Sequence, residues 1–285
     1  MRSYAADFEL VEMQGLAAAL ELLGAKERWR PMAGGTDLMV LFNAGKLEGR
    51  KFFSVRQIPE LIEIEVQEDS VAIGAAMTFS QIRSSKVLQR EFPLLCHSAS
   101  WTGGLANQNR ATIGGNIMNA SPAADSPPSL LAYEAELELI SKLGSRRIPY
   151  IQFHTGYKQM QIRSDELLCK VHLKRPKGDW KQYGRKVGAR KAQAISKVCV
   201  AAMARMEGRV INDIRLSLGS VAATPLRCVR TESDLRGQTI TAELIAAAKG
   251  TLTQEIAPID DIRSTASYRS QVAQNLLGEF LVSLL

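Results

Sequence analysis

Apolar residues near the N-terminus follow the spacing of a helix. Between residues 16 and 23, leucine and alanine recur at three- and four-residue intervals, and Gly24 stands where such a helix would end. A short strand is predicted before this helix at residues 8–10, and a glycine-containing loop with an apolar stretch at residues 39–42 follows it. Residues 1–54 are therefore predicted to form a compact unit of helix and strand.

The hydrophobic period changes to two in the next part of the chain. Residues 62–66 and 71–73 alternate apolar with polar or small side chains on either side of a Glu68-Asp69 turn, which predicts an antiparallel hairpin. One helix is predicted over residues 79–88, with Thr78 as its N-cap. Further predicted elements are a helix or turn after residue 128 and strands at residues 137–139 and 167–173.

A second hairpin and two closing helices are predicted in the last third of the chain. The strands cover residues 195–206 and 210–220 and are joined by Glu207-Gly208-Arg209. The helices are expected at residues 241–249 and 265–284. Because hairpins outnumber regular strand–helix–strand units, the pattern predicts the α+β class, with a domain boundary near residues 174–181.

Composition is that of an ordinary globular protein, with 285 residues, 46% hydrophobic and 23% charged. No segment has the layout of a signal peptide, and no run of about eighteen apolar residues could span a bilayer, so a cytoplasmic protein without membrane contact is expected. Four cysteines stand far apart, which argues against a disulfide framework and against a zinc or iron–sulfur site on this chain: Cys96, Cys169, Cys199 and Cys228.

The net charge of +7 is concentrated in residues 170–191, where lysine and arginine far outnumber the single acid Asp179. Such a run is usually a solvated face, but it can also serve a polyphosphate or a docking surface. Nucleic-acid binding is not expected, because Trp180 and Tyr183 are the only aromatic residues interleaved with it.

Two loops carry adjacent glycines flanked by small polar residues. Glycine has no Cβ, so the backbone amides of such loops can approach an anion closely, and two loops together could hold one diphosphate from both sides. Neither GxGxxG nor GxxxxGK followed by Ser or Thr occurs in the chain. The first loop consists of Pro31, Met32, Ala33, Gly34, Gly35, Thr36, Asp37 and Leu38, and the second of Ala111, Thr112, Ile113, Gly114, Gly115 and Asn116.

These loops closely resemble those of the FAD-binding subunits of molybdenum hydroxylases, the family of xanthine and carbon monoxide dehydrogenases. The resemblance continues in the same order over essentially the whole chain, at residues 120–125, 153–158, 183–188, 219–227 and 265–269. It implies two subdomains of the vanillyl-alcohol-oxidase (PCMH) type that clasp FAD, over about residues 1–54 and 55–176. A C-terminal domain of antiparallel sheet and helices would follow at residues 177–285.

The resemblance also implies roles for single residues. The backbone of residues 31–38 should hold the FAD diphosphate and ribityl chain, with the Thr36 hydroxyl donating, and residues 111–116 should approach the diphosphate from the second subdomain. Asp125 should accept from a sugar or ribityl hydroxyl, Leu168 should contact the flavin, and Lys186 should reach toward the isoalloxazine and stabilise its anionic reduced form. No catalytic residue and no metal ligand is expected on this chain.

Each of these roles has an alternative. Asp125 could cap the turn before Pro127, Lys186 could be a solvated member of the basic run, and Leu168 could belong to the core. Tyr157 could lie near the flavin edge or pack on its own turn, and no ligand spacing connects His97, His154 and His172, which are expected to be structural or on the surface.

The motif at residues 153–158 departs from the family's FFxGYR pattern, with His154 for the second aromatic residue and Lys158 for arginine. Lysine offers a phosphate one contact where arginine offers two, which puts efficient use of NAD⁺ in doubt. The chain also lacks the cysteine-rich insertion with which some relatives bind a further iron–sulfur cluster.

The function implied is that of an electron-transfer subunit. A large subunit with the molybdenum cofactor would oxidise a purine or related N-heterocycle, a small subunit with 2Fe-2S clusters would pass the electrons on, and FAD on this chain would hand them to NAD⁺ or another acceptor. Alternatives are a carbon monoxide or aldehyde dehydrogenase subunit, a stand-alone FAD oxidoreductase, and a cofactor-free binding or assembly protein.

Overall fold

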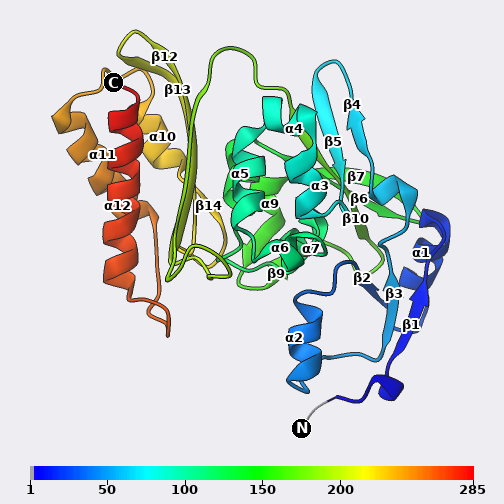
Figure 1. Ribbon diagram of the computed structural model, residues 1–285. Helices are drawn as coiled ribbons and strands as arrows, with labels where there is room; N and C mark the ends of the chain where they lie inside the picture. The colour runs from blue at the N-terminus through cyan, green and yellow to red at the C-terminus, as the bar shows by residue number, and fades with distance from the viewer. Residues whose placement is uncertain (1–2) are drawn as a thin grey trace.

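The computed structural model describes residues 3–285 and combines helices with three main sheets and a two-stranded ribbon (Figure 1). The strands are β1 (Glu9–Glu12), β2 (Arg30–Met32), β3 (Lys51–Ser54), β4 (Ile64–Val66), β5 (Ser70–Gly74), β6 (Glu136–Ser141), β7 (Gly144–Pro149), β8 (His154–Gly156), β9 (Gln159–Met160), β10 (Leu167–Lys174), β11 (Lys181–Val187), β12 (Val198–Glu207), β13 (Val210–Gly219) and β14 (Leu226–Arg227). The helices are α1 (Leu16–Leu23), α2 (Leu38–Asn43), α3 (Phe79–Ser84), α4 (Lys86–Glu91), α5 (Pro93–Trp101), α6 (Leu105–Gln108), α7 (Ile113–Met118), α8 (Pro127–Ala132), α9 (Tyr150–Phe153), α10 (Val229–Leu235), α11 (Ala242–Glu255) and α12 (Ala266–Ser283), with 3-10 turns η1 (Ala5–Asp7) and η2 (Pro59–Leu61).

The N-terminal unit is a small parallel sheet in the order β1-β3-β2, packed against α1. Helix α1 has the predicted limits, and Gly24 follows it as its C-cap. Ala19 and Leu20 of this helix are buried against Phe53 and Ile58, so the predicted apolar face does form a core. The first glycine loop leaves this sheet at the end of β2 and leads directly into α2.

The second unit is an antiparallel sheet in the order β4-β5-β10-β6-β7, with helices α3 to α9 gathered on one face (Figure 1). The predicted hairpin of β4 and β5 is present. Alternate residues of the strands, such as Val71, Leu137 and Val171, point into the core under these helices. The second glycine loop enters α7 and therefore lies on the helical side of this sheet.

One predicted helix in this unit was wrong in its extent. Thr78 does cap α3 through a capping box with Gln81, but the helix ends at Ser84 and a separate helix, α4, begins at Lys86. Ser85 between them has an extended backbone, with φ −71° and ψ 114°. The chain therefore leaves the helical conformation at this residue, and α3 does not continue into α4. The apolar residues Phe79, Ile82 and Leu88 are all buried, and this is why the pattern resembled one helix.

The C-terminal unit is an antiparallel sheet in the order β11-β12-β13-β14. One face of this sheet packs on α5 and α8 of the preceding unit, and the other packs on α10 and α12 (Figure 1). The predicted hairpin of β12 and β13 and the closing helix α12 are present, whereas α11 extends six residues beyond its predicted end, to Glu255. The fold is thus a mixed one, in which a small parallel sheet and a helix-covered antiparallel sheet precede a second antiparallel sheet with its own helices.

Residues of the basic run do not form one solvated face. They are divided between β10, the following linker and β11, and most face an acid. Ion pairs join Lys170 to Glu65, Arg175 to Glu91, Lys177 to Asp69, Arg185 to Glu279 and Lys186 to Asp125. Among residues 3–285, no helix combines the length and apolar character that a membrane crossing requires.

Candidate functional site

A cavity of about 790 Å³ lies where the two glycine loops meet. This volume falls within the range of about 300–1,000 Å³ that is usual for cofactor sites. Its wall brings together residues from the N-terminal unit and from the helical side of the central unit. It is lined by Arg30, Pro31, Ala33, Gly34, Gly35, Thr36, Asp37, Leu38, Leu41, Glu48, Thr102, Gly103, Asn107, Ala111, Thr112, Gly115, Asn116, Met118, Asn119, Lys158 and Met160.

The first loop supplies unused backbone donors. Within residues 3–285, no hydrogen bond uses the amide N–H of Gly34, Gly35 or Thr36. Gly35 has φ +71°, in the left-handed region that favours glycine, and this turns the loop so that it can enter α2. Successive amides that the protein itself leaves unpaired are suited to an anion.

Contact between the two loops depends on Gly34. A Cβ at this position would lie 1.8 Å from the carbonyl oxygen of Arg110, directly before the second loop. The Arg110 side chain in turn donates from Nε to the carbonyl oxygen of Gly34, at 3.5 Å. The first loop can therefore approach the second only with glycine at residue 34.

The second loop uses most of its amides internally, which differs from the expected role. The amides of Ile113 and Gly114 donate to the carbonyl oxygens of Met77 and Ala75, at 3.0 and 2.8 Å. The amide of Gly115 donates to the Thr112 hydroxyl, the N-cap of α7, at 3.0 Å. These amides anchor the loop and do not face the cavity as free donors. Glycine is required at residue 114 because a Cβ there would lie 2.6 Å from the carbonyl oxygen of Ala75.

Side chains bridge the two loops across the cavity wall. Asn119 donates from Nδ2 to the Asp37 carboxylate at 3.2 Å and accepts at Oδ1 from the Lys158 ammonium at 2.6 Å. Asn116 accepts from the Ser126 hydroxyl at Oδ1, which leaves its amide nitrogen available as a donor. Lys158 and Arg30 place two cations on the wall, which would favour an anionic ligand, and Asp37 and Glu48 place two carboxylates there.

Asp125 and Lys186 form a buried ion pair directly behind this wall. Lys186 Nζ donates to Asp125 Oδ2 at 2.6 Å and to the carbonyl oxygen of Trp101 at 3.0 Å, and the next two residues, Thr102 and Gly103, line the cavity. Burial raises the pKa of Asp125, while Lys186 and the Ser196 hydroxyl, which donates to Oδ1 at 2.6 Å, act in the opposite direction. The alternative that Lys186 is a solvated member of the basic run is therefore wrong, because its side chain is only 8% exposed. The alternative that Asp125 caps the turn before Pro127 is also wrong, because its carboxylate bonds to Lys186 and Ser196.

Most predicted residues of the two loops lie on the cavity wall, and several others do not. Met32 packs beneath Gly35, and Ile113 and Gly114 are buried in the start of α7. Leu168 is a buried core residue of β10, in agreement with its alternative role. The predicted residues that do not line the cavity are Met32, Ile113, Gly114, Asp125, Leu168 and Lys186.

Ten residues of the wall were not among the predicted site residues: Arg30, Leu41, Glu48, Thr102, Gly103, Asn107, Met118, Asn119, Lys158 and Met160. Lys158 is the one of these with a signal in the sequence, because it stands in the family motif at residues 153–158. Tyr157 is 67% exposed and does not line the cavity.

The histidines have structural contacts. His97 packs on Trp101, His154 meets the carbonyl oxygen of Ile117, and His172 pairs with Glu138. Burial lowers the pKa of His97 and of His154. Among residues 3–285, no three His, Cys, Asp or Glu side chains gather as a metal site would require.

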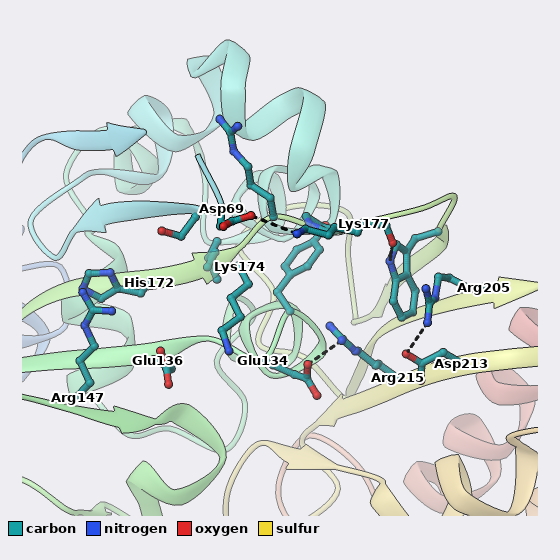
Figure 2. Close-up of a pocket in the computed structure, with 16 residues that line it drawn as sticks. Asp69, Glu134, Glu136, Arg147, His172, Lys174, Lys177, Arg205, Asp213 and Arg215 are labelled. Carbon is teal, nitrogen blue, oxygen red and sulfur yellow. Dashed lines mark hydrogen bonds and ion pairs between the residues drawn. The ribbon is translucent and has the colours of Figure 1, made fainter. Parts of the chain in front are cut away.

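A second cavity, of about 550 Å³, lies between the central sheet and strands β12 and β13 (Figure 2). Its charged side chains largely neutralise one another, as in the ion pairs of Glu134 with Arg215 and of Asp213 with Arg205. It shares no residue with the wall formed by the glycine loops, on which eleven of the predicted site residues lie. The first cavity is therefore the candidate cofactor site.

The fold and the two-loop cavity define the class of an FAD-binding flavoprotein, and comparison with known proteins identifies its family. The model described as "FAD binding domain in molybdopterin dehydrogenase" matches residues 6–176, and "CO dehydrogenase flavoprotein C-terminal domain" matches residues 184–284. The chain belongs to the family of FAD-binding subunits of molybdenum hydroxylases.

Relatives within this family carry different names. The chain is 32% identical to a xanthine dehydrogenase FAD-binding subunit of Escherichia coli, covering 92% of this chain and 90% of that one. It is 29% identical to the glyceraldehyde dehydrogenase medium chain of Sulfolobus acidocaldarius, covering 96% of each. The solved structure of carbon monoxide dehydrogenase from Hydrogenophaga pseudoflava superposes with a TM-score of 0.91 at 26% identity, covering 95% of each chain.

FAD fits the residues present at the cavity. Its diphosphate requires closely spaced donors, which the amides of residues 34–36 provide, and cations nearby, which Arg30 and Lys158 provide. The apolar side chains of Leu38, Leu41, Met118 and Met160 supply surface for a flat ring system. The donor set and the shape of the wall therefore agree with the family's cofactor.

Proposed function

We propose that this chain holds FAD between its two glycine loops and serves as the electron-transfer subunit of a xanthine dehydrogenase-like complex. The observation that carries the proposal is the convergence of both loops on one cavity, where the first loop presents unpaired amides. Bound there, FAD would supply one- and two-electron redox chemistry between an iron–sulfur donor and NAD⁺ or another acceptor. The chain itself would be divided into an FAD-binding domain at residues 1–176 and a C-terminal domain at residues 177–285.

The loops would have different tasks. Amides of Gly34, Gly35 and Thr36, with the Thr36 hydroxyl, would donate to the diphosphate and ribityl chain, since no partner within residues 3–285 competes for them. The second loop would act mainly through Thr112 and the free amide nitrogen of Asn116. Its glycines would anchor the loop, Gly114 against Ala75 and Gly115 on the Thr112 hydroxyl, and would not themselves donate to FAD.

The ion pair of Asp125 and Lys186 would set the charge near the flavin. Lys186 lies behind Thr102 and Gly103, so its cation would act on the ring system from that end of the cavity. Asp125 accepts from Lys186 and compensates part of its charge, which would moderate the effect on the flavin potential.

The partners would be a large subunit with the molybdenum cofactor and a small subunit with 2Fe-2S clusters. Support comes from relatives named as FAD-binding subunits or medium chains of dehydrogenases. Xanthine or a related N-heterocycle is the proposed substrate, because the relative at 32% identity is named for xanthine dehydrogenase.

Co-purification tests this function. The full chain, tagged and expressed in its native cell, is expected to co-purify with one molybdenum-containing subunit and one 2Fe-2S subunit. The complex should show the absorbance of FAD. The complex is then assayed on xanthine, glyceraldehyde and carbon monoxide with NAD⁺ or an artificial acceptor. A complex that oxidises only an aldehyde or carbon monoxide would contradict the substrate, and a flavin-free complex would contradict the subunit's role.

A further inference from the structure

A chain of hydrogen bonds connects the C-terminal domain with the ion pair behind the proposed flavin site. Ser196, two residues before β12, donates from its buried hydroxyl to Asp125 Oδ1 at 2.6 Å, while Lys186 donates to Oδ2. Each carboxylate oxygen thus has one donor: Lys186 comes from β11, and Ser196 comes from the segment that connects β11 to β12. Asp125 itself lies in the FAD-binding unit, between α7 and α8.

Ser196 is held in place from behind. The Ser220 hydroxyl donates to the carbonyl oxygen of Ser196 at 2.9 Å, and the amide of Ser220 donates to the carbonyl oxygen of Pro122 at 2.8 Å. Ser220 has φ +66°, a left-handed conformation that a non-glycine residue adopts at a cost and that persists where its surroundings require it. The strained residue thereby connects the loop before Asp125 with the segment that carries Ser196.

Arg269 closes the network. Its guanidinium, only 4% exposed, donates from one nitrogen to the carbonyl oxygens of Lys197 and Ser220, at 2.8 and 3.2 Å, and from another to Asp261, at 2.8 Å. Arg269 lies in the first turn of α12, so the closing helix fixes both segments that converge on Ser196. A planar guanidinium is suited to holding two carbonyl groups in a fixed relation.

We infer that Ser196 is a positioning residue for the flavin site: it holds the Asp125 carboxylate ionised and directed at Lys186, with Ser220 and Arg269 fixing Ser196 in turn. The C-terminal domain then contributes to the charge presented to the cofactor and does more than pack against the FAD-binding domain. The inference rests on the proposed function, because the charge matters only where a flavin binds near Lys186.

Ser196 affects the flavin through the Asp125 carboxylate, which compensates the positive charge of Lys186. A hydrogen bond to an ionised group stabilises that form, so loss of the Ser196 hydroxyl should raise the pKa of Asp125 further and favour its protonated form. A protonated Asp125 no longer compensates the positive charge of Lys186, and this uncompensated charge favours the anionic reduced flavin. The flavin midpoint potential should therefore move upward when Ser196 loses its hydroxyl.

The test is a double-mutant cycle in the full chain reconstituted with FAD, read out as the flavin midpoint potential. Ser196→Ala and Asp125→Asn should each raise the potential, Asp125→Asn by more, and Ser196→Ala should add nothing further in the Asp125→Asn background. Ser217→Ala is the matched control, because Ser217 is also fully buried in the C-terminal sheet but its hydroxyl has no hydrogen-bond partner within residues 3–285. The flavin midpoint potential of Ser217→Ala should equal that of the unaltered chain.

Other outcomes separate the possible failures. An unchanged potential in Ser196→Ala, or an equal shift with and without Asp125, would overturn the positioning role while leaving the proposed FAD site intact. If the unaltered chain takes up no FAD, the proposed function itself fails. Should Ser196→Ala not fold, Ser220→Ala removes the hydroxyl behind it and should give a smaller upward shift that again vanishes in the Asp125→Asn background; a shift that persists there would overturn the inference.

Discussion

Adjacent glycines of the first loop are constrained by different physical causes, and the sequence revealed only that both were present. Gly34 is required because the backbone of Arg110 leaves no room for a Cβ, and Gly35 because its φ is positive. Pairing of Asp125 with Lys186 could not be predicted, since the two residues are 61 positions apart and belong to different motifs. The two glycine loops of the cavity wall thus followed from local patterns, whereas the ion pair followed only from the folded chain.

Replacing Gly34 by alanine should abolish FAD binding. The added Cβ would lie within 1.8 Å of a backbone oxygen, so the first loop must move away from the second and open the cavity wall. FAD retention on purification and titration of the apo chain provide the measurement. Gly250→Ala is the control, because nothing lies within 4 Å of a Cβ at that helical position, and retention of normal FAD affinity by Gly34→Ala would contradict the two-loop site.

Lys186→Met should lower the flavin midpoint potential and also destabilise the chain. Removing one partner of a buried ion pair leaves the other charge uncompensated, which typically costs about 3–5 kcal/mol. Urea unfolding and spectroelectrochemistry test the two effects separately. Lys177→Met removes a cation whose ion pair with Asp69 is highly exposed, and it should change neither quantity appreciably; an unaltered potential in Lys186→Met would return Lys186 to a structural role.

At the scale of the elements, the apolar patterns predicted those strands and helices whose partners are near in sequence. The hairpins β4–β5 and β12–β13, α1 and α12 were found close to their predicted limits. The break at Ser85 was not predicted, because burial on both sides of it continues the helical period. The parallel pairing of β1 with β3 joins strands some forty positions apart, and periodicity carries no information on such pairs.

A buried carboxylate holds the segment before β10 against β7. Glu166 accepts from Arg146 Nε and Nη2 at 2.7 and 3.0 Å and from the amide of Arg163 at 2.8 Å, and these bonds to Arg146 lower the pKa of Glu166. A carboxyl group whose pKa is lower in the folded than in the unfolded chain stabilises the fold at pH values above its unfolded-state pKa. This stabilisation is lost as the pH falls through the folded-state pKa. Stabilisation by Glu166 is therefore present at neutral pH and absent in strong acid.

Glu166→Gln should accordingly cost about 1–2 kcal/mol of unfolding free energy at pH 7, and this difference should shrink below about pH 4. Urea unfolding of both chains at the two pH values gives the comparison. Glu21→Gln, which removes an exposed ion pair with Lys142, should show little effect at either pH. A penalty for Glu166→Gln that stayed constant into strong acid would show that packing, and not charge, is responsible.

At the scale of the whole molecule, the central claim is that one FAD binds where the N-terminal and central units meet. A ligand that contacts both units should stabilise them together, by RT ln(1 + [L]/Kd), or about 2.7 kcal/mol at a hundredfold excess over Kd. The C-terminal domain would be stabilised as well, because its sheet packs on α5 and α8 of the central unit. Residues of the family motifs predicted the cofactor, and the packing of the N-terminal unit on the central unit determines where the cavity forms.

The most direct measurement is a calorimetric titration of the apo full chain with FAD, carried out alongside Gly34→Ala and Gly250→Ala. We expect one FAD to bind per chain in the unaltered protein and in Gly250→Ala, with a matching rise in the unfolding temperature, and no binding in Gly34→Ala. Absence of FAD binding by the unaltered chain, or equal binding by all three chains, would contradict a site formed by the contact of the two glycine loops.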